Sequence, residues 1–196
     1  MMYTLIGGKR SRSMRVLWLL HEMGLDFEHI QEPPQSPKVR ALNPSGRIPV
    51  LLVDGITLTD STAILTYLAD KHGQFTFAAG TTDRAIQDSF TQVILDDLDA
   101  LLWTASRHSF ILPEEMRLPA IKDSLKWEFT RNLDRLGARL GQGPFLMGDT
   151  MTVPDIILAH CIGWAGGAKF PVQNPAISAH NTMMRGRPAF KAALAD

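Results

Sequence analysis

The sequence predicts a two-domain protein in which an α/β domain is followed by an all-helical domain. Short β-prone runs flank one apolar helical segment over residues 3–30, and an Asp-Gly turn joins two further apolar runs over residues 50–59. Beyond residue 81 the apolar residues recur at helical spacing. The 196 residues, 45% of them hydrophobic, are enough to form the cores of one or two domains.

The first 30 residues predict a strand, a helix and a second strand. Residues 3–6 are apolar and β-prone, and two glycines end the run. In residues 13–23 apolar side chains cover most of the helix circumference, and Gly24 stands where a left-handed helix cap is expected. Residues 25–30 form the second strand, which the crossover rule makes parallel to the first.

A short helix and a hairpin follow. Ser36-Pro37 supplies a cap and a first-turn proline for a helix over residues 38–41. Residues 50–53 and 56–59 flank Asp54-Gly55, a strong hairpin signal because both turn residues tolerate positive φ.

The first domain ends with a helix that Thr59 or Asp60 caps and that stops at Gly73. A βαβ unit followed by a hairpin and a helix is the thioredoxin-like arrangement. We therefore assign residues 1–73 to a thioredoxin-like domain and residues 74–81, which lack any amphipathic period, to a linker.

Residues 82–196 are expected to form the helical domain. The predicted helices span residues 82–103, 114–140 and 152–164, with two short helices after Pro175 and Pro188. Thr152 and Asp155 have the spacing of a capping box, so we assign them to folding rather than to chemistry.

Composition excludes several classes of function. Twenty basic residues balance twenty acidic ones, so no overall field favours nucleic acid or an anionic membrane. The single cysteine, Cys161, excludes an intramolecular disulfide and a multi-cysteine zinc site, and the histidines form no recognisable metal set. No segment approaches a membrane span or a signal peptide. We expect a cytoplasmic protein with no metal.

Two motifs in the first domain can hold a small peptide. A cis bond at Ile48-Pro49 would leave the Ile48 backbone free to pair with an extended ligand, although a trans proline at a strand entrance is the commoner arrangement. Asp60-Ser61 stands at a helix start, where the N–H groups and the dipole attract a carboxylate. Asp60 can also accept from an ammonium group, but either residue can be a plain helix cap.

The ordered set of motifs resembles the cytosolic glutathione transferases over nearly the whole chain. The matching segments are Tyr3-Thr4-Leu5, Asn43-Pro44-Ser45-Gly46-Arg47-Ile48-Pro49, Asp60-Ser61-Thr62-Ala63-Ile64, Gly148 to Asp155 and Arg187-Pro188-Ala189-Phe190. The resemblance implies a glutathione site in the first domain, a helical domain that shapes the pocket for the electrophile, and a homodimer.

The resemblance also implies roles for individual residues. Ile48, beside Pro49, would pair through its backbone with the cysteinyl unit of glutathione. Asp60 and Ser61 would hold the γ-glutamyl head, and Arg47 could reach a glycyl or glutamyl carboxylate.

The group that activates the thiol is expected in the turn after the first strand. Family members carry Tyr, Ser or Cys there, and this turn contains Ser11 and Ser13 but no cysteine. Tyr3 lies too early in the chain. Ser11 aligns best when Arg15 and the following apolar helix are kept in register, and Ser13 is the alternative.

Trp103, His108 and Phe110 are the candidates for the electrophile pocket, with core packing as their other explanation. We therefore predict a detoxifying glutathione transferase that acts on small hydrophobic electrophiles. The alternative is a non-enzymatic dimerisation or scaffold protein with the same fold.

Overall fold

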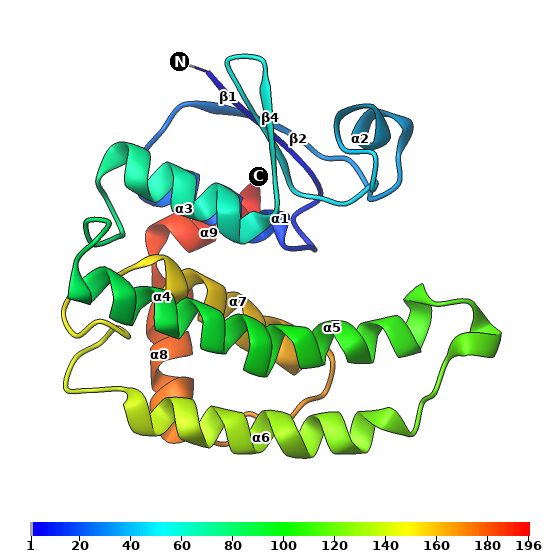
Figure 1. The fold of residues 1–196 in the computed structure, drawn as a ribbon, viewed down its shortest axis with the longest axis vertical. Coiled ribbons are helices and arrows are strands. Elements are labelled where there is room, and N and C mark those ends of the chain that lie inside the picture. Colours follow the sequence, from blue (N-terminus) through cyan, green and yellow to red (C-terminus); the bar gives the residue numbers. More distant parts are fainter. Residues whose placement is uncertain (1) are drawn as a thin grey trace. The chain divides into compact units, whose positions relative to one another are not determined.

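The computed structural model describes residues 2–196, which form two compact units (Figure 1). One unit comprises the described chain up to Ala79 together with Arg185–Asp196, and the other comprises Gly80–Met184. The boundary near residue 79 lies inside the predicted linker. The functional division into 1–73, 74–81 and 82–196 stays a prediction.

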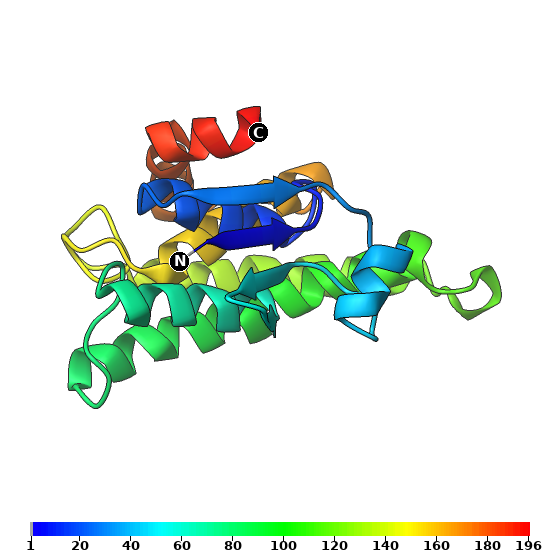
Figure 2. The same cartoon turned by 90° about the horizontal axis from the view of Figure 1, so that it is seen from above.

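The first unit is built on a four-stranded sheet. Its strands are β1 (Tyr3–Ile6), β2 (Phe27–Ile30), β3 (Val50–Val53) and β4 (Ile56–Thr59). The spatial order is β2-β1-β3-β4. Strand β1 is parallel to β2 (Figure 2) and antiparallel to β3, and β3 is antiparallel to β4. The parallel pair and the Asp-Gly hairpin are both as predicted.

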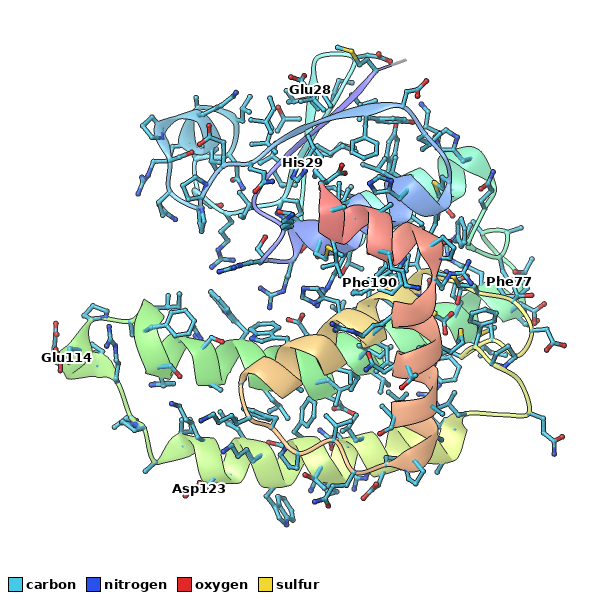
Figure 3. The ribbon with its side chains drawn as sticks, turned by 180° about the vertical axis from the view of Figure 1, so that it is seen from behind. Glu28, His29, Phe77, Glu114, Asp123 and Phe190 are labelled. Carbon is cyan, nitrogen blue, oxygen red and sulfur yellow. The ribbon has the colours of Figure 1, made fainter. Side chains whose placement is uncertain are left out.

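Four helices accompany the sheet: α1 (Ser13–Glu22), α2 (Pro37–Leu42), α3 (Ser61–His72) and α9 (Pro188–Ala195). Helices α1 and α3 pack against each other, and Val39 of α2 packs against Ile6 and Val50 of the sheet. Helix α9, which carries Phe190 (Figure 3), packs on α1. The Phe190 ring meets the Trp18 ring edge-on with centroids 4.8 Å apart. The predicted thioredoxin-like α/β class is confirmed.

The second unit is helical, as predicted, but its first two helices have different bounds. Its elements are α4 (Thr82–Ile94), a π turn (Leu95–Asp99), α5 (Ala100–Ser106), a second π turn (Arg107–Ile111), a 3-10 turn (Glu114–Met116), α6 (Ile121–Arg139) and α7 (Val153–Gly167), followed by α8 (Pro175–Gly186).

The expected helix start at residue 114 is wrong, because only one 3-10 turn forms there and α6 begins at Ile121. Pro119 accounts for the delay, since it has no N–H to donate and disfavours helical geometry at Leu118.

Two features are absent from the described part of the chain. None of its helices combines the length and the apolar character needed to cross a membrane. Residues 2–196 also contain no group of three or more His, Cys, Asp or Glu side chains placed to hold a metal ion. That the protein uses no metal remains a prediction.

Candidate functional site

The Ile48-Pro49 peptide bond is cis and leads directly into β3. The preceding turn is braced by Asn43, whose Nδ2 donates to the Arg47 carbonyl at 2.9 Å and whose carbonyl accepts from the Gly46 N–H at 2.8 Å. Within residues 2–196 the Ile48 main chain makes no hydrogen bond to another main-chain group. The loop therefore holds the Ile48 backbone in place while leaving it available to an extended ligand.

Asp60 begins α3 in a backbone conformation that is rare for a residue with a side chain. Its φ is +70°, and its Oδ1 accepts from the Thr62 and Ala63 N–H groups at 2.9 and 3.0 Å. The carboxylate is exposed, so its second oxygen can accept from a ligand. Unusual backbone conformations of this kind concentrate at functional sites.

Ser61 lies beside Asp60 at the first turn of α3 but is buried, with 2% of its surface exposed. Its Oγ accepts from Nη1 of Arg15, a fully buried side chain of α1, at 3.4 Å. Because this bond uses an oxygen lone pair, the Ser61 proton is free to be donated to another acceptor. The start of α3 thus carries a hydroxyl that is held by the buried Arg15 of α1, and a helix start favours an anionic ligand.

The turn between β1 and α1 places Ser11 and Ser13 side by side. Ser11 Oγ donates to the Gly8 carbonyl at 2.7 Å, accepts from the Ser13 N–H at 3.1 Å and lies 3.0 Å from Ser13 Oγ. Ser11 is half-buried, whereas Ser13 is 0% exposed. Of these two serines, only Ser11 has appreciable exposed surface.

The Tyr3 hydroxyl makes its hydrogen bond away from this turn. It lies 2.9 Å from His72 Nε2, at the last residue of α3, and the side chain is 2% exposed. Burial raises the pKa of the Tyr3 hydroxyl above its ordinary value of 10.0. Tyr3 therefore belongs to the core of the first unit.

Trp103, His108 and Phe110 all lie in the second unit, on the segment formed by α5 and the π turn after it. Trp103 is half-buried and Phe110 is 66% exposed. His108 has a structural contact, because its Nδ1 accepts from the Leu118 N–H at 3.1 Å. Their assignment to the electrophile pocket stays a prediction.

The sequence had assigned no site role to two residues. Gly7 was used only to end the first strand, and Arg15 only to fix the register of the alignment. Arg15 contacts Ser61, and Gly7 makes room for Ser13, since a Cβ on Gly7 would lie 2.2 Å from Ser13 Oγ. A charged residue inside the otherwise apolar segment 14–20 was the available signal for Arg15. Nothing in the local sequence pointed to the contact between Gly7 and Ser13.

An open hollow of about 450 Å³ lies elsewhere on the first unit. Its lining residues are His21, Glu22, Arg187, Pro188, Ala189 and Ala192, none of which belongs to the predicted glutathione site. Arg187 Nε and Nη2 donate to the two Glu22 carboxylate oxygens at 2.6 and 2.8 Å. This ion pair ties Arg187 to α1, and His21 of the lining lies 2.7 Å from Asp196 Oδ2.

Comparison with known proteins agrees with the fold. A family model for the N-terminal domain of glutathione S-transferases matches residues 11–71. Glutathione S-transferase 3 of Caenorhabditis elegans is 30% identical over 148 residues, which are 72% of this chain and 69% of the relative.

Solved structures of glutathione transferases match nearly the whole chain. An enzyme from Methylococcus capsulatus has a TM-score of 0.83 at 28% identity and covers 98% of this chain and 97% of its own. URE2P6 from Phanerochaete chrysosporium was solved in complex with oxidized glutathione. It has a TM-score of 0.83 at 25% identity, and the match covers 98% of this chain and 94% of URE2P6.

The chain belongs to the glutathione S-transferase family. The predicted class of enzyme, a glutathione transferase, is confirmed.

Proposed function

We propose that the protein binds glutathione in its first unit, activates the thiol with Ser11 and transfers the sulfur to small hydrophobic electrophiles. The observation that carries the proposal is the partly exposed Ser11 in the turn before α1, in the same unit as the cis-proline loop and the start of α3. In this reading the enzyme is a cytoplasmic homodimer with a role in detoxification.

Each part of glutathione has a partner in this unit. The Ile48 main chain pairs with the cysteinyl unit beside Pro49. The start of α3 and Ser61 hold the γ-glutamyl carboxylate, and the free oxygen of Asp60 accepts from its ammonium group. Arg47 is exposed and can reach the glycyl carboxylate.

Ser11 supplies the chemistry. A free thiol has a pKa of about 8.5, and lowering it by about two requires roughly 2.7 kcal/mol of stabilisation of the thiolate. A hydrogen bond from Ser11 and the start of α1 share this requirement. The thiol proton passes to water, the thiolate attacks the electrophilic carbon, and a leaving group such as halide departs as the C–S bond forms. Trp103, His108 and Phe110 are proposed to contact the electrophile.

Ser11→Ala is expected to lower kcat for a chlorodinitrobenzene substrate by about 10- to 100-fold, the value of one hydrogen bond to a charged group. Glutathione affinity, measured by calorimetry, changes much less because the peptide contacts remain. Ser36→Ala is the matched control, since it removes a hydroxyl from the start of α2, where Ser36 accepts from the Val39 N–H at 3.2 Å. Unchanged turnover in Ser11→Ala would exclude Ser11 as the donor to the thiolate, and absence of glutathione binding by the unaltered protein would favour a scaffold.

Asp60→Asn is expected to weaken glutathione binding about tenfold through loss of the charge that faces the ammonium group. Thermal stability should hardly change, because Asn caps helices as well as Asp and tolerates positive φ. Calorimetry with glutathione and with its analogue lacking the γ-glutamyl amino group checks the assignment. Equal losses for the two ligands would show that Asp60 does not recognise the ammonium.

A further inference from the structure

Ser13 lies directly behind Ser11, in a position that the proposed reaction does not use. It is the first residue of α1 and is 0% exposed, so no ligand reaches it. Its Oγ is 3.0 Å from Ser11 Oγ. Within residues 2–196 the Ser11 hydroxyl is the side-chain partner of Ser13 Oγ.

The protons of the two hydroxyls can be assigned by counting donors and acceptors. Each hydroxyl carries one proton, and the Gly8 carbonyl, 2.7 Å from Ser11 Oγ, can only accept. With the Ser11 proton directed to Gly8, the 3.0 Å contact between the two hydroxyls is a hydrogen bond only when Ser13 is the donor. Ser11 Oγ then receives two hydrogen bonds from one residue, from the Ser13 N–H and from the Ser13 O–H.

We infer that Ser13 is a positioning residue for thiolate activation, which donates its hydroxyl proton to Ser11 Oγ and directs the Ser11 proton toward the glutathione sulfur. The inference rests on the proposed function. When the thiolate forms, its proton passes to water and Ser11 exchanges the Gly8 carbonyl for the sulfur, while both bonds from Ser13 remain. An oxygen that accepts two hydrogen bonds is a more polarised donor, so it stabilises the thiolate better.

The packing around Ser13 supports a fixed role. A Cβ on Gly7 would lie 2.2 Å from Ser13 Oγ and 3.0 Å from Ile48 Cβ, so the bare Gly7 backbone lies against both side chains. The same contacts therefore set the spacing between the hydroxyl pair and the Ile48 backbone proposed to hold the cysteinyl unit. Ser13 links the activating group to the group that positions the sulfur.

The test is a double-mutant cycle with Ser13→Ala, Ser11→Ala and the double variant in the full-length protein. The pKa of the bound glutathione thiol is read from the ultraviolet absorbance of the thiolate across pH. Affinity for S-methylglutathione, which has no thiol, is measured in parallel. The charged groups near the turn, Lys9, Arg10, Arg12, Arg15, His29 and Asp60, are the same in all variants, so their effects on the thiol cancel.

Ser13→Ala is expected to raise the pKa of the bound thiol by about 0.5–1 and to lower kcat/KM below that pKa by about 3- to 10-fold. The affinity for S-methylglutathione should stay within about twofold of the unaltered protein's. In the Ser11→Ala background, Ser13→Ala should change neither the thiol pKa nor kcat/KM further. Ser36→Ala, the control at another helix start, should leave the thiol pKa unchanged. Ser13→Cys, a weak donor of similar shape, should act in the same direction and replaces Ser13→Ala if that variant does not fold.

An unchanged thiol pKa in Ser13→Ala or Ser13→Cys overturns the inference while leaving the proposed function intact. A full additional loss in the Ser11→Ala background overturns it as well, since Ser13 would then act independently of Ser11. Failure of the unaltered protein to bind S-methylglutathione would instead refute the proposed function, and the inference with it.

Discussion

Asp155→Ala is expected to lower the free energy of unfolding by about 3–5 kcal/mol, because it removes a buried carboxylate from its hydrogen-bonding partners. The carboxylate is 0% exposed. Its Oδ1 accepts from the Leu146 N–H at 2.8 Å and lies 2.9 Å from His180 Nε2, and its Oδ2 accepts from the Thr152 N–H at 2.8 Å and Oγ1 at 3.1 Å. Alanine would leave four buried donors without their acceptor.

Urea unfolding followed by tryptophan fluorescence measures the effect, and Asp149→Ala is the matched control. Asp149 is exposed on the preceding turn, so its loss should change the free energy of unfolding by less than about 0.5 kcal/mol. A similar small change for Asp155→Ala would mean that the network around this carboxylate contributes little to folding.

The capping box itself was predictable from the sequence, but the rest of the network was not. Thr152 and Asp155 are three residues apart, and their reciprocal bonds at the start of α7 follow from local spacing. His180 is 25 residues away on α8, and its contact with Asp155 arises only from the packing of α8 against this region. Its Nδ1 is buried without a partner among the described residues, so the contact with Asp155 is made by Nε2.

The same contrast holds for the fold. Asp54 and Gly55 have φ values of +47° and +84°, as their residue types predicted, and the hairpin they close has the expected strands. The helical segment that begins with α4 was predicted to end at residue 103 but continues through a second π turn to Ile111, and the extra residue of a π turn breaks the helical period on which the prediction relied. The hairpin was therefore predictable from its turn residues, whereas the π turns were not predictable from the spacing of apolar residues.

At the candidate site, sequence order indicated which motifs to join but not how they touch. The cis bond at Pro49 and the cap by Asp60 lie where the motifs placed them. Alignment register favoured Ser11 over Ser13, but the burial of Ser13 could not be read from the sequence. In the structure Ser13 is buried and packs against Gly7, the residue that follows β1. No sequence-spacing rule predicts this contact.

Gly7→Ala is expected to disrupt the site and to lower the free energy of unfolding by about 2–6 kcal/mol. Gly7 has a φ of +141°, a region that residues with a side chain rarely adopt, and its new Cβ would lie 2.2 Å from Ser13 Oγ and 3.0 Å from Ile48 Cβ. Backbone strain and overpacking each contribute about 1–3 kcal/mol. Relief would require Ser13 or the cis-proline loop to move, so conjugating activity should fall together with stability.

Gly24→Ala separates the two causes. Gly24 also has a positive φ, +62°, but a Cβ there would meet nothing within 4 Å. It should lose about 1–2 kcal/mol from backbone strain alone and keep its activity. Urea unfolding and turnover of a chlorodinitrobenzene substrate, measured on both variants, distinguish the effect of backbone strain from that of the steric contact. If the two substitutions were equally costly and equally active, the contact between Gly7, Ser13 and Ile48 would not be what holds the hydroxyl pair against the cis-proline loop.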